Sequence, residues 1–376
     1  MITREQSRDK NMDHSMDTYH TTCVDQNIDQ IVEKIIAGQR ISREEGLKLF
    51  YDAELLTLAR LAENRRFERH PDRIVTFVVD RNINYTNICV SGCRFCAFYK
   101  TLESGQGYVI TRDSLKAKIA ETIALGGTQI LLQGGMNPEL SLDYYTDLLT
   151  FIKDRFDIHV HGFSPPEISF IAEKSGLSIA ETITRLRKAG LDSIPGGGAE
   201  ILCDEVRKKV SPNKCLTDTW LEVMRVAHGQ GMRSSATMMF GHLESPCHIV
   251  EHLSRIRELQ DETGGFTAFI PWTFQPGNTK IQVPKTGSVP YLRVLALSRI
   301  FLDNIDNIQA SWVTQGDKIA QTALFYGAND MGSTMIEENV VAAAGVDFML
   351  PESEIKRLIT TAGFEPRQRD CYYNLL

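Results

Sequence analysis

The chain has 376 residues, of which 42% are hydrophobic and 24% are charged, and its formal net charge at pH 7 is −7. This balance predicts a globular protein with one large core, and the acidic charge offers no basic surface for nucleic acid. No long uncharged apolar stretch occurs and the polar N-terminus lacks a signal-peptide core, so we expect a cytoplasmic protein without membrane insertion.

Two segments precede the main pattern of the sequence. Residues 1–27 are polar and aperiodic, so we expect a disordered tail there. From 28 to 70, apolar residues such as Ile31, Ile35, Leu58 and Leu61 recur at helical spacing. This spacing predicts an N-terminal helical extension.

Residues 71–350 alternate short apolar strands with amphipathic helices, which predicts a parallel α/β sheet with right-handed crossovers. At least six such units, without a dinucleotide glycine fingerprint after an early strand, favour a full or partial TIM-like (β/α) barrel over a doubly wound sheet. For 351–376 we expect one short helix, 352–362, and an irregular end. The strands are expected at 75–79, 83–86, 128–132, 159–163, 193–194, 236–240, 266–271 and 308–312.

Polar and glycine-rich clusters follow these strands, at the carboxyl-terminal rim where barrels place their active sites. They are Gln133-Gly134-Gly135, His161-Gly-Phe-Ser164, Pro195-Gly196-Gly197-Gly198, Gly241-His242 and Trp272-Thr-Phe-Gln275.

One cysteine cluster stands out, Cys89-Val-Ser-Gly-Cys93-Arg-Phe-Cys96, with the spacing C-x3-C-x2-C. Three thiolates on one loop can bind three irons of a 4Fe-4S cubane and leave the fourth iron open to a substrate. A structural zinc site is the alternative, but it would need a fourth Cys or His at matching spacing, which the nearby chain does not supply. The other cysteines are scattered singly.

With Phe95 in the aromatic position, the cluster resembles the signature of radical S-adenosylmethionine (SAM) enzymes. This resemblance implies a 4Fe-4S cluster held by Cys89, Cys93 and Cys96, with SAM bound to the open iron. Phe95 and the segment Gln133-Gly134-Gly135 would then contact SAM, since glycine lets a backbone approach closely. Glu200, after the triple glycine, is a further cofactor-binding candidate. A tight turn after each strand would explain the glycines equally well.

Over about 77–345 the sequence resembles the dehypoxanthine futalosine cyclase family of the futalosine route to menaquinone. The resemblance implies cyclisation of dehypoxanthine futalosine through removal of the ribose C4′ hydrogen by a deoxyadenosyl radical, with an external low-potential electron donor. Aminofutalosine synthase and deazaflavin synthase are the alternatives, and a non-enzymatic cysteine-metal protein is a third. The resemblance rests on 80–87, 159–167, 194–200, 236–242, 269–276 and 327–333.

His161, Glu167, His242 and Glu200 follow expected strands, so they are the candidates for proton transfer and ribose contacts. Each could instead be a satisfied structural group, and Glu167 could cap the helix after Pro165-Pro166. Two further sets are candidates for binding the aromatic ring and the carboxylate of the substrate, although core packing and surface exposure explain them equally well. They are Tyr85, Trp272 and Phe274 for the ring, and Arg81, Arg233 and Arg293 for the carboxylate.

Overall fold

The computed structural model describes residues 27–346 and 349–376. The expected disordered tail therefore lies outside the described residues, apart from Asn27, whose side chain caps the first helix. No helix within the described ranges is long and apolar enough to cross a membrane.

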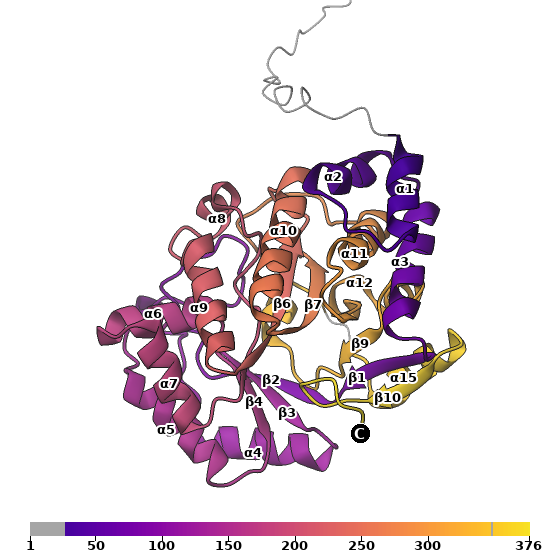
Figure 1. The fold of residues 1–376 in the computed structure, drawn as a ribbon. Coiled ribbons are helices and arrows are strands. Elements are labelled where there is room, and N and C mark those ends of the chain that lie inside the picture. The colour runs from indigo at the N-terminus through magenta and orange to yellow at the C-terminus, as the bar shows by residue number, and fades with distance from the viewer. Residues whose placement is uncertain (1–26, 347–348) are drawn as a thin grey trace, which may run out of the picture.

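Three helices fill the segment expected to be helical: α1 (Ile28–Ile36), α2 (Arg43–Asp52) and α3 (Leu55–Arg69). A capping box fixes the start of α2, because the Glu45 N–H donates to Ser42 Oγ and the Ser42 N–H donates to Glu45 Oε2. α2 and α3 pack on α11 (Ser288–Phe301), on the outside of the barrel, and α1 packs on α2 and α3 (Figure 1).

Seven parallel strands form the main sheet in sequential order, each hydrogen-bonded to the next. This curled sheet, covered by helices, confirms the expected TIM-like α/β architecture. The strands are β2 (Asp80–Asn84), β3 (Gln129–Gln133), β4 (His159–Gly162), β5 (Ser193–Ile194), β6 (Arg233–Phe240), β7 (Phe266–Thr273) and β8 (Asn307–Ile308).

Helices follow most strands and cover the outer face of this sheet (Figure 1). Their apolar faces pack on the buried strands in one continuous core that includes Leu132, Val160, Ile194 and Phe269. The α-helices that come after β2, in chain order and whether or not they cover this face, are α4 (Arg112–Ala124), α5 (Leu142–Lys153), α6 (Pro165–Ser175), α7 (Ile179–Ala189), α8 (Asp204–Val210), α9 (Thr217–Gly229), α10 (Pro246–Thr263), α11, α12 (Trp312–Gln315), α13 (Asp317–Ala323), α14 (Asn339–Ala343) and α15 (Glu352–Thr361).

A second, three-stranded sheet has the order β10-β1-β9, formed by β1 (Ile74–Val78), β9 (Asp330–Ser333) and β10 (Glu365–Gln368). An isolated parallel bridge between Gln309 and Asp330 connects it to the end of the main sheet. The expected irregular C-terminus is therefore wrong in part, because residues 365–368 form a strand. Its sequence, Glu-Pro-Arg-Gln, has no apolar pattern, and the pairing with β1 alone makes it extended.

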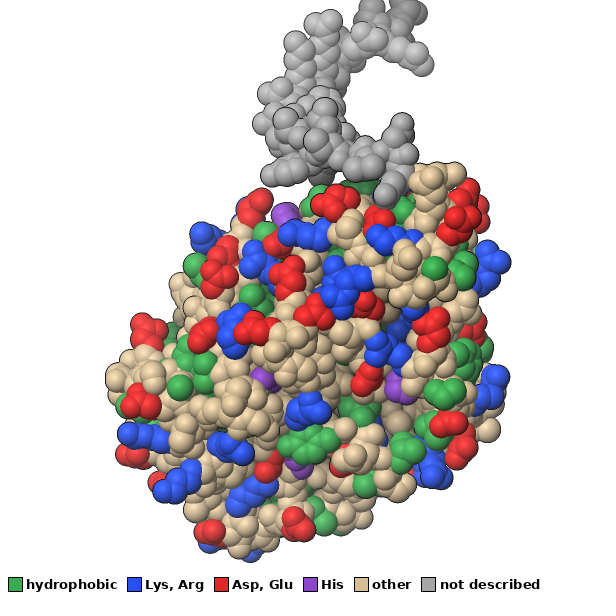
Figure 2. Space-filling view, viewed as in Figure 1, with side chains coloured by type: hydrophobic (Ala, Val, Ile, Leu, Met, Phe, Trp, Pro, Cys, Tyr) green, Lys and Arg blue, Asp and Glu red, His purple; other side chains and the backbone are tan. Residues whose placement is uncertain are grey.

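The expected strand at 308–312 ends early, and Trp312 instead begins α12. The Trp312 indole N–H donates to Ser333 O at 3.0 Å, which ties this turn to β9. On the face seen in Figure 2, acidic and basic side chains are interspersed and apolar ones are scattered among them. This face therefore presents no large patch of a single charge.

Candidate active site

The cysteine loop follows β2 and is held by backbone hydrogen bonds on both sides. The Cys89 N–H donates to Lys100 O at 3.0 Å, and the Val90 N–H donates to Met136 O at 3.0 Å. The second bond connects the loop to the segment after β3, the neighbouring strand. The three cysteines thus lie on a loop fixed at the carboxyl-terminal rim of the sheet.

One hydroxyl group contacts two of the three thiols. Ser91 Oγ lies 3.0 Å from Cys89 Sγ and 3.2 Å from Cys93 Sγ, and the Met136 N–H donates to Cys89 Sγ at 3.3 Å. Burial raises the pKa of Cys93 to about 11, and it also raises the pKa of Cys96. None of the three is in a disulfide. Cys89, Cys93 and Cys96 are thus free to bind a metal.

Gly135 lets the cysteine loop and the segment after β3 approach each other closely. A Cβ atom at this position would lie 2.1 Å from Ile88 O and 2.9 Å from Cys89 Cβ. The nearest obstacle is backbone, so no side-chain rotation could relieve the clash. A side chain at position 135 would therefore displace the residue that carries the first thiol.

We expect Gly135→Ala to reduce cluster binding strongly and to destabilise the fold by about 1–3 kcal/mol, the usual cost of overpacking. Iron bound per chain after anaerobic reconstitution, together with urea unfolding, measures both effects. Gly229→Ala is the matched control, because a Cβ there meets nothing within 4 Å and the position is helical. Equal iron content in the two variants would contradict the assigned role of Gly135.

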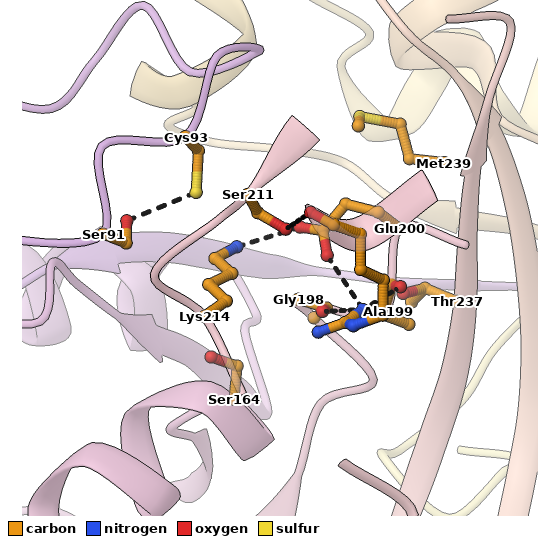
Figure 3. A network of polar contacts seen from close by, with 12 residues as sticks. Ser91, Cys93, Ser164, Gly198, Ala199, Glu200, Ser211, Lys214, Thr237 and Met239 are labelled. Atoms are coloured by element: carbon orange, nitrogen blue, oxygen red, sulfur yellow. Dashed lines mark hydrogen bonds and ion pairs between the residues drawn. The ribbon is translucent and has the colours of Figure 1, made fainter. Parts of the chain in front are cut away.

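A buried ionic network lies beside the cysteine loop (Figure 3). Lys214 Nζ lies 2.9 Å from Glu200 Oε1 and 5.1 Å from the centre of the Phe95 ring, and Arg207 Nη1 lies 3.5 Å from Glu200 Oε2. The positive charge of Lys214 favours the thiolate of Cys93. The network therefore joins two predicted cofactor-binding residues, Glu200 and Phe95, to the cysteines.

The glycine segment after β3 is tied to Glu167, at the start of α6. Glu167 Oε1 accepts from the Tyr85 hydroxyl at 2.7 Å and from the Gly134 N–H at 2.9 Å. Its Oε2 accepts from the Ser164 N–H at 2.8 Å and the Ser164 hydroxyl at 2.5 Å. The buried Glu167 carboxyl group thus accepts four hydrogen bonds, and Glu167 completes the capping box of α6 with the N-cap residue Ser164, the structural role that the sequence left open.

A cavity of about 300 Å³ lies inside the barrel. His161, Trp272, Gln133 and Glu200 line it, so the structure brings together candidates from four different strand ends. Its other polar lining is mostly uncharged side chains, among them Asn82, Gln129, Ser235, Thr237, Gln309, Ser311 and Thr314. Such a cavity, apolar with a few convergent polar groups, has the character of a ligand site.

His242 does not line this cavity, and both of its ring nitrogens have partners. The Leu243 N–H donates to Nδ1 at 2.7 Å, and Nε2 lies 3.0 Å from Met239 O. Burial lowers the pKa of His242. The ring of Phe274, at 6.1 Å between centroids, packs on His242 in the core.

None of the three candidate arginines lines the cavity. Arg81 pairs with Glu121 at 2.6 Å, Arg233 is exposed, and Arg293 donates to Ala53 O at 2.7 Å. Of the described residues, Arg369 is the one Lys or Arg in the lining, and the buried Asp330 already pairs with it at 2.6 Å. A ligand carboxylate would thus find its donors among neutral side chains, in a lining that also contains the carboxyl groups of Asp80, Glu200 and Glu338.

Several residues of the site carry no recognisable sequence signal. Lys214 lies in an irregular loop, Ser193 in a two-residue strand, and Arg369 near the C-terminus. Their roles follow from contacts between distant segments, which no local pattern encodes. Their burial and their partners depend on the fold, so neither could be predicted from the sequence.

Two family models match the chain. Residues 83–256 match the radical SAM superfamily, and residues 263–376 match the CofH/MqnC C-terminal region. The first match contains the cysteine loop and part of the cavity lining. The second contains most of the lining, together with β7, β8, β9 and β10. β1 and the first residues of β2 precede both matches.

Curated relatives align over most of the chain. It is 47% identical to a cyclic dehypoxanthine futalosine synthase of Halalkalibacterium halodurans, covering 93% of this chain and 95% of the relative. A synthase of the same name from Streptomyces coelicolor is 42% identical over 93% of this chain and 89% of its own. Also 42% identical, over 84% of this chain and 93% of its own, is a 5-amino-6-(D-ribitylamino)uracil–L-tyrosine 4-hydroxyphenyl transferase of Archaeoglobus fulgidus.

Solved structures share the fold at low sequence identity. The FeFe-hydrogenase maturase HydG from Carboxydothermus hydrogenoformans superposes with a TM-score of 0.72 at 18% identity, over 92% of this chain and 80% of its own. Methylornithine synthase (PylB) gives 0.67 at 16% identity, over 89% of this chain and 97% of its own. These likenesses confirm the barrel architecture.

Proposed function

The chain belongs to the radical SAM superfamily and, within it, to the family of cyclic dehypoxanthine futalosine synthases, and on this basis we propose that it cyclises dehypoxanthine futalosine. The product is cyclic dehypoxanthine futalosine, on the futalosine route to menaquinone. One observation carries the proposal: candidate SAM-binding residues, Gln133 and Glu200, line the same cavity as His161 and Trp272. Cofactor and substrate can therefore meet there.

The cysteine loop fits a 4Fe-4S cluster held by three thiolates. Cys93 is buried, the Met136 N–H already points at the Cys89 sulfur, and Lys214 supplies a compensating positive charge. Hydrogen bonds to sulfur and nearby charge are features that tune such clusters. We therefore propose Cys89, Cys93 and Cys96 as the ligands, with the fourth iron open.

The residues around the loop also fit SAM. Phe95 offers an aromatic surface, Gly134 and Gly135 bring backbone close to the thiols, and Glu200 presents a buried carboxylate at a positive φ of 41°. When bound together and reduced, cluster and SAM supply a carbon radical that can remove the ribose C4′ hydrogen. The protein's own task is to hold C4′ in reach and to exclude water.

The cavity supplies the remaining functions. Trp272 offers a ring for contact with the substrate benzoate, and the hydroxyl and amide groups of Thr314 and Gln309 are placed to receive its carboxylate. His161 is the proton acceptor we propose. An external low-potential reductant must supply the electron. The seven free cysteines among the described residues are consistent with the reducing environment of a cytoplasm.

The decisive experiment incubates the reconstituted protein with dehypoxanthine futalosine, SAM and a strong reductant under anaerobic conditions. We expect a cyclised product two hydrogens lighter than the substrate, together with deoxyadenosine, both seen by mass spectrometry. A parallel reaction receives L-tyrosine and 5-amino-6-(D-ribitylamino)uracil, the substrates that the Archaeoglobus relative's name specifies. If product formed only in this second reaction, the protein would be a transferase and the proposed cyclase activity would be wrong.

A further inference from the structure

The hydroxyl of Ser193 lies between two histidine rings. His159 Nε2 is 2.7 Å and His161 Nδ1 is 2.6 Å from Ser193 Oγ, and Cys371 Sγ is 3.4 Å from the same oxygen. The two histidines are two residues apart on β4 and therefore share one face of the strand, which is the face toward the barrel interior. On the neighbouring strand β5, Ser193 is the residue paired with His161. This imidazole-hydroxyl-imidazole chain is therefore fixed by the sheet.

The two ends of the chain meet different surroundings. His161 lines the cavity, and its Nε2 has only a long contact of 3.4 Å, to Ser235 Oγ. His159 does not line the cavity but is partly exposed, at the first residue of β4, where Tyr372 packs edge-on against its ring. The chain thus leads from the cavity to the amino-terminal end of the barrel, opposite the cysteine loop.

A metal site is the alternative use of these atoms, because the nitrogens of His159 and His161 and the sulfur of Cys371 lie within 4.8 Å of one another. Ser193 Oγ, however, stands among all three at hydrogen-bonding distance. A metal ion would compete with that oxygen for the same space, and the hydroxyl already satisfies the histidines. The contacts therefore favour a hydrogen-bonded relay.

We propose that His161, Ser193 and His159 form a proton relay that carries the proton released by the substrate ring out of the cavity. The inference rests on the proposed cyclisation, which must end by restoring an aromatic ring. One ring C–H bond then breaks, and its proton goes to His161 Nε2. One of the bond's electrons pairs with the radical electron in the ring, and the other leaves to a one-electron acceptor of the iron–sulfur class.

One assignment of donors and acceptors among these groups lets the relay start. The His161 Nδ1–H and the Cys371 S–H donate to Ser193 Oγ, and the Ser193 O–H donates to His159 Nε2. His161 Nε2 then presents its lone pair to the cavity. Burial lowers the pKa of His161 to about 3, which keeps this nitrogen unprotonated until a proton arrives. Shifting each proton by one bond delivers the charge to His159.

The test uses the reconstituted holoenzyme, dehypoxanthine futalosine deuterated on its benzoate ring, and the variants Ser193→Ala, Ser193→Thr and His159→Gln. Deoxyadenosine and cyclised product are followed separately in a single turnover. Ser234→Ala is the matched control: Ser234 Oγ lies 2.6 Å from Nε2 of another buried histidine, His228, and lines no part of the cavity.

In Ser193→Ala and His159→Gln we expect deoxyadenosine at the unaltered rate but about 10²-fold slower product, the usual contribution of one positioned proton-transfer group. Deprotonation would then limit the rate, so ring deuteration should slow product further in these variants and not in Ser193→Thr or Ser234→Ala. A merely structural defect would lower deoxyadenosine and product together.

Three results would overturn the relay. The first is Ser193→Ala that forms product at the unaltered rate without an isotope effect. The second is equal loss of deoxyadenosine and product. The third is one equivalent of zinc, by elemental analysis, that disappears in Cys371→Ser. If the unaltered enzyme forms no cyclised product, the proposed function fails and the relay with it, whereas the first three outcomes leave the cyclase intact.

Discussion

Replacing Cys93 with alanine is expected to abolish formation of deoxyadenosine and of cyclised product, a loss of about 10³-fold or more. The physical reason is that the cofactors supply the radical chemistry, and a cluster with two remaining thiolates is not held. Cys93 is the most informative of the three cysteines because it is buried and faces Lys214. Iron and sulfide per chain, and electron paramagnetic resonance of the reduced protein, measure the loss directly.

Cys247→Ala is the matched control for this experiment. Cys247 is a free, partly exposed cysteine on α10, away from the cysteine loop. We expect its variant to keep full iron content and full turnover. If Cys93→Ala retained four irons and the ability to cleave SAM, the proposed ligand set would be wrong.

The second large effect is on stability: Arg369→Met is expected to lower the free energy of unfolding by about 3–5 kcal/mol, the cost of leaving one partner of a buried ion pair alone. Arg369 donates from Nε to Asp330 Oδ2 at 2.6 Å and from Nη2 to Oδ1 at 3.0 Å. Asp330 is 0% exposed. The Thr76 hydroxyl and the Gly332 N–H would remain as its only donors in the described structure.

Urea unfolding of Arg369→Met beside Arg367→Met separates this pair from a general effect of removing charge near the C-terminus. Arg367 lies on β10, its side chain is 47% exposed, and it pairs at 3.5 Å with Glu365, whose side chain is 60% exposed, so little change is expected. Adding Asp330→Asn to Arg369→Met should recover part of the lost stability. Equal unfolding midpoints for the two single variants would contradict the role of the pair.

The barrel was predictable because its signal is local. Short apolar runs such as Ile130–Leu132 and Phe266–Phe269 need burial on both faces, and the amphipathic helices between them supply the covering layer. The edges of the barrel were less predictable. β10 has a polar sequence with little burial, and its extended form depends on β1, 291 residues earlier in the chain.

The candidate site likewise contains residues that a local sequence pattern predicts and residues whose roles depend on distant contacts. Spacing alone brought Cys89, Cys93 and Cys96 together, because only six residues separate Cys89 from Cys96, which limits how far apart the thiols can lie. His161 within β4, Gln133 at the end of β3 and Glu200 after β5 all line one cavity. Their positions in the sequence could not distinguish them from Glu167, which carries four hydrogen bonds, or from His242, which faces the backbone.

The sequence by itself therefore determined the barrel, the three thiols and the radical SAM resemblance, since each depends on residues close together in the chain. The tertiary structure decided which polar groups face the cavity, how Lys214 meets the cysteine loop, and that Ser193 joins two histidines. These contacts bring together residues from separate strands and loops. Their energies depend on burial and distance, which exist only once the chain has folded.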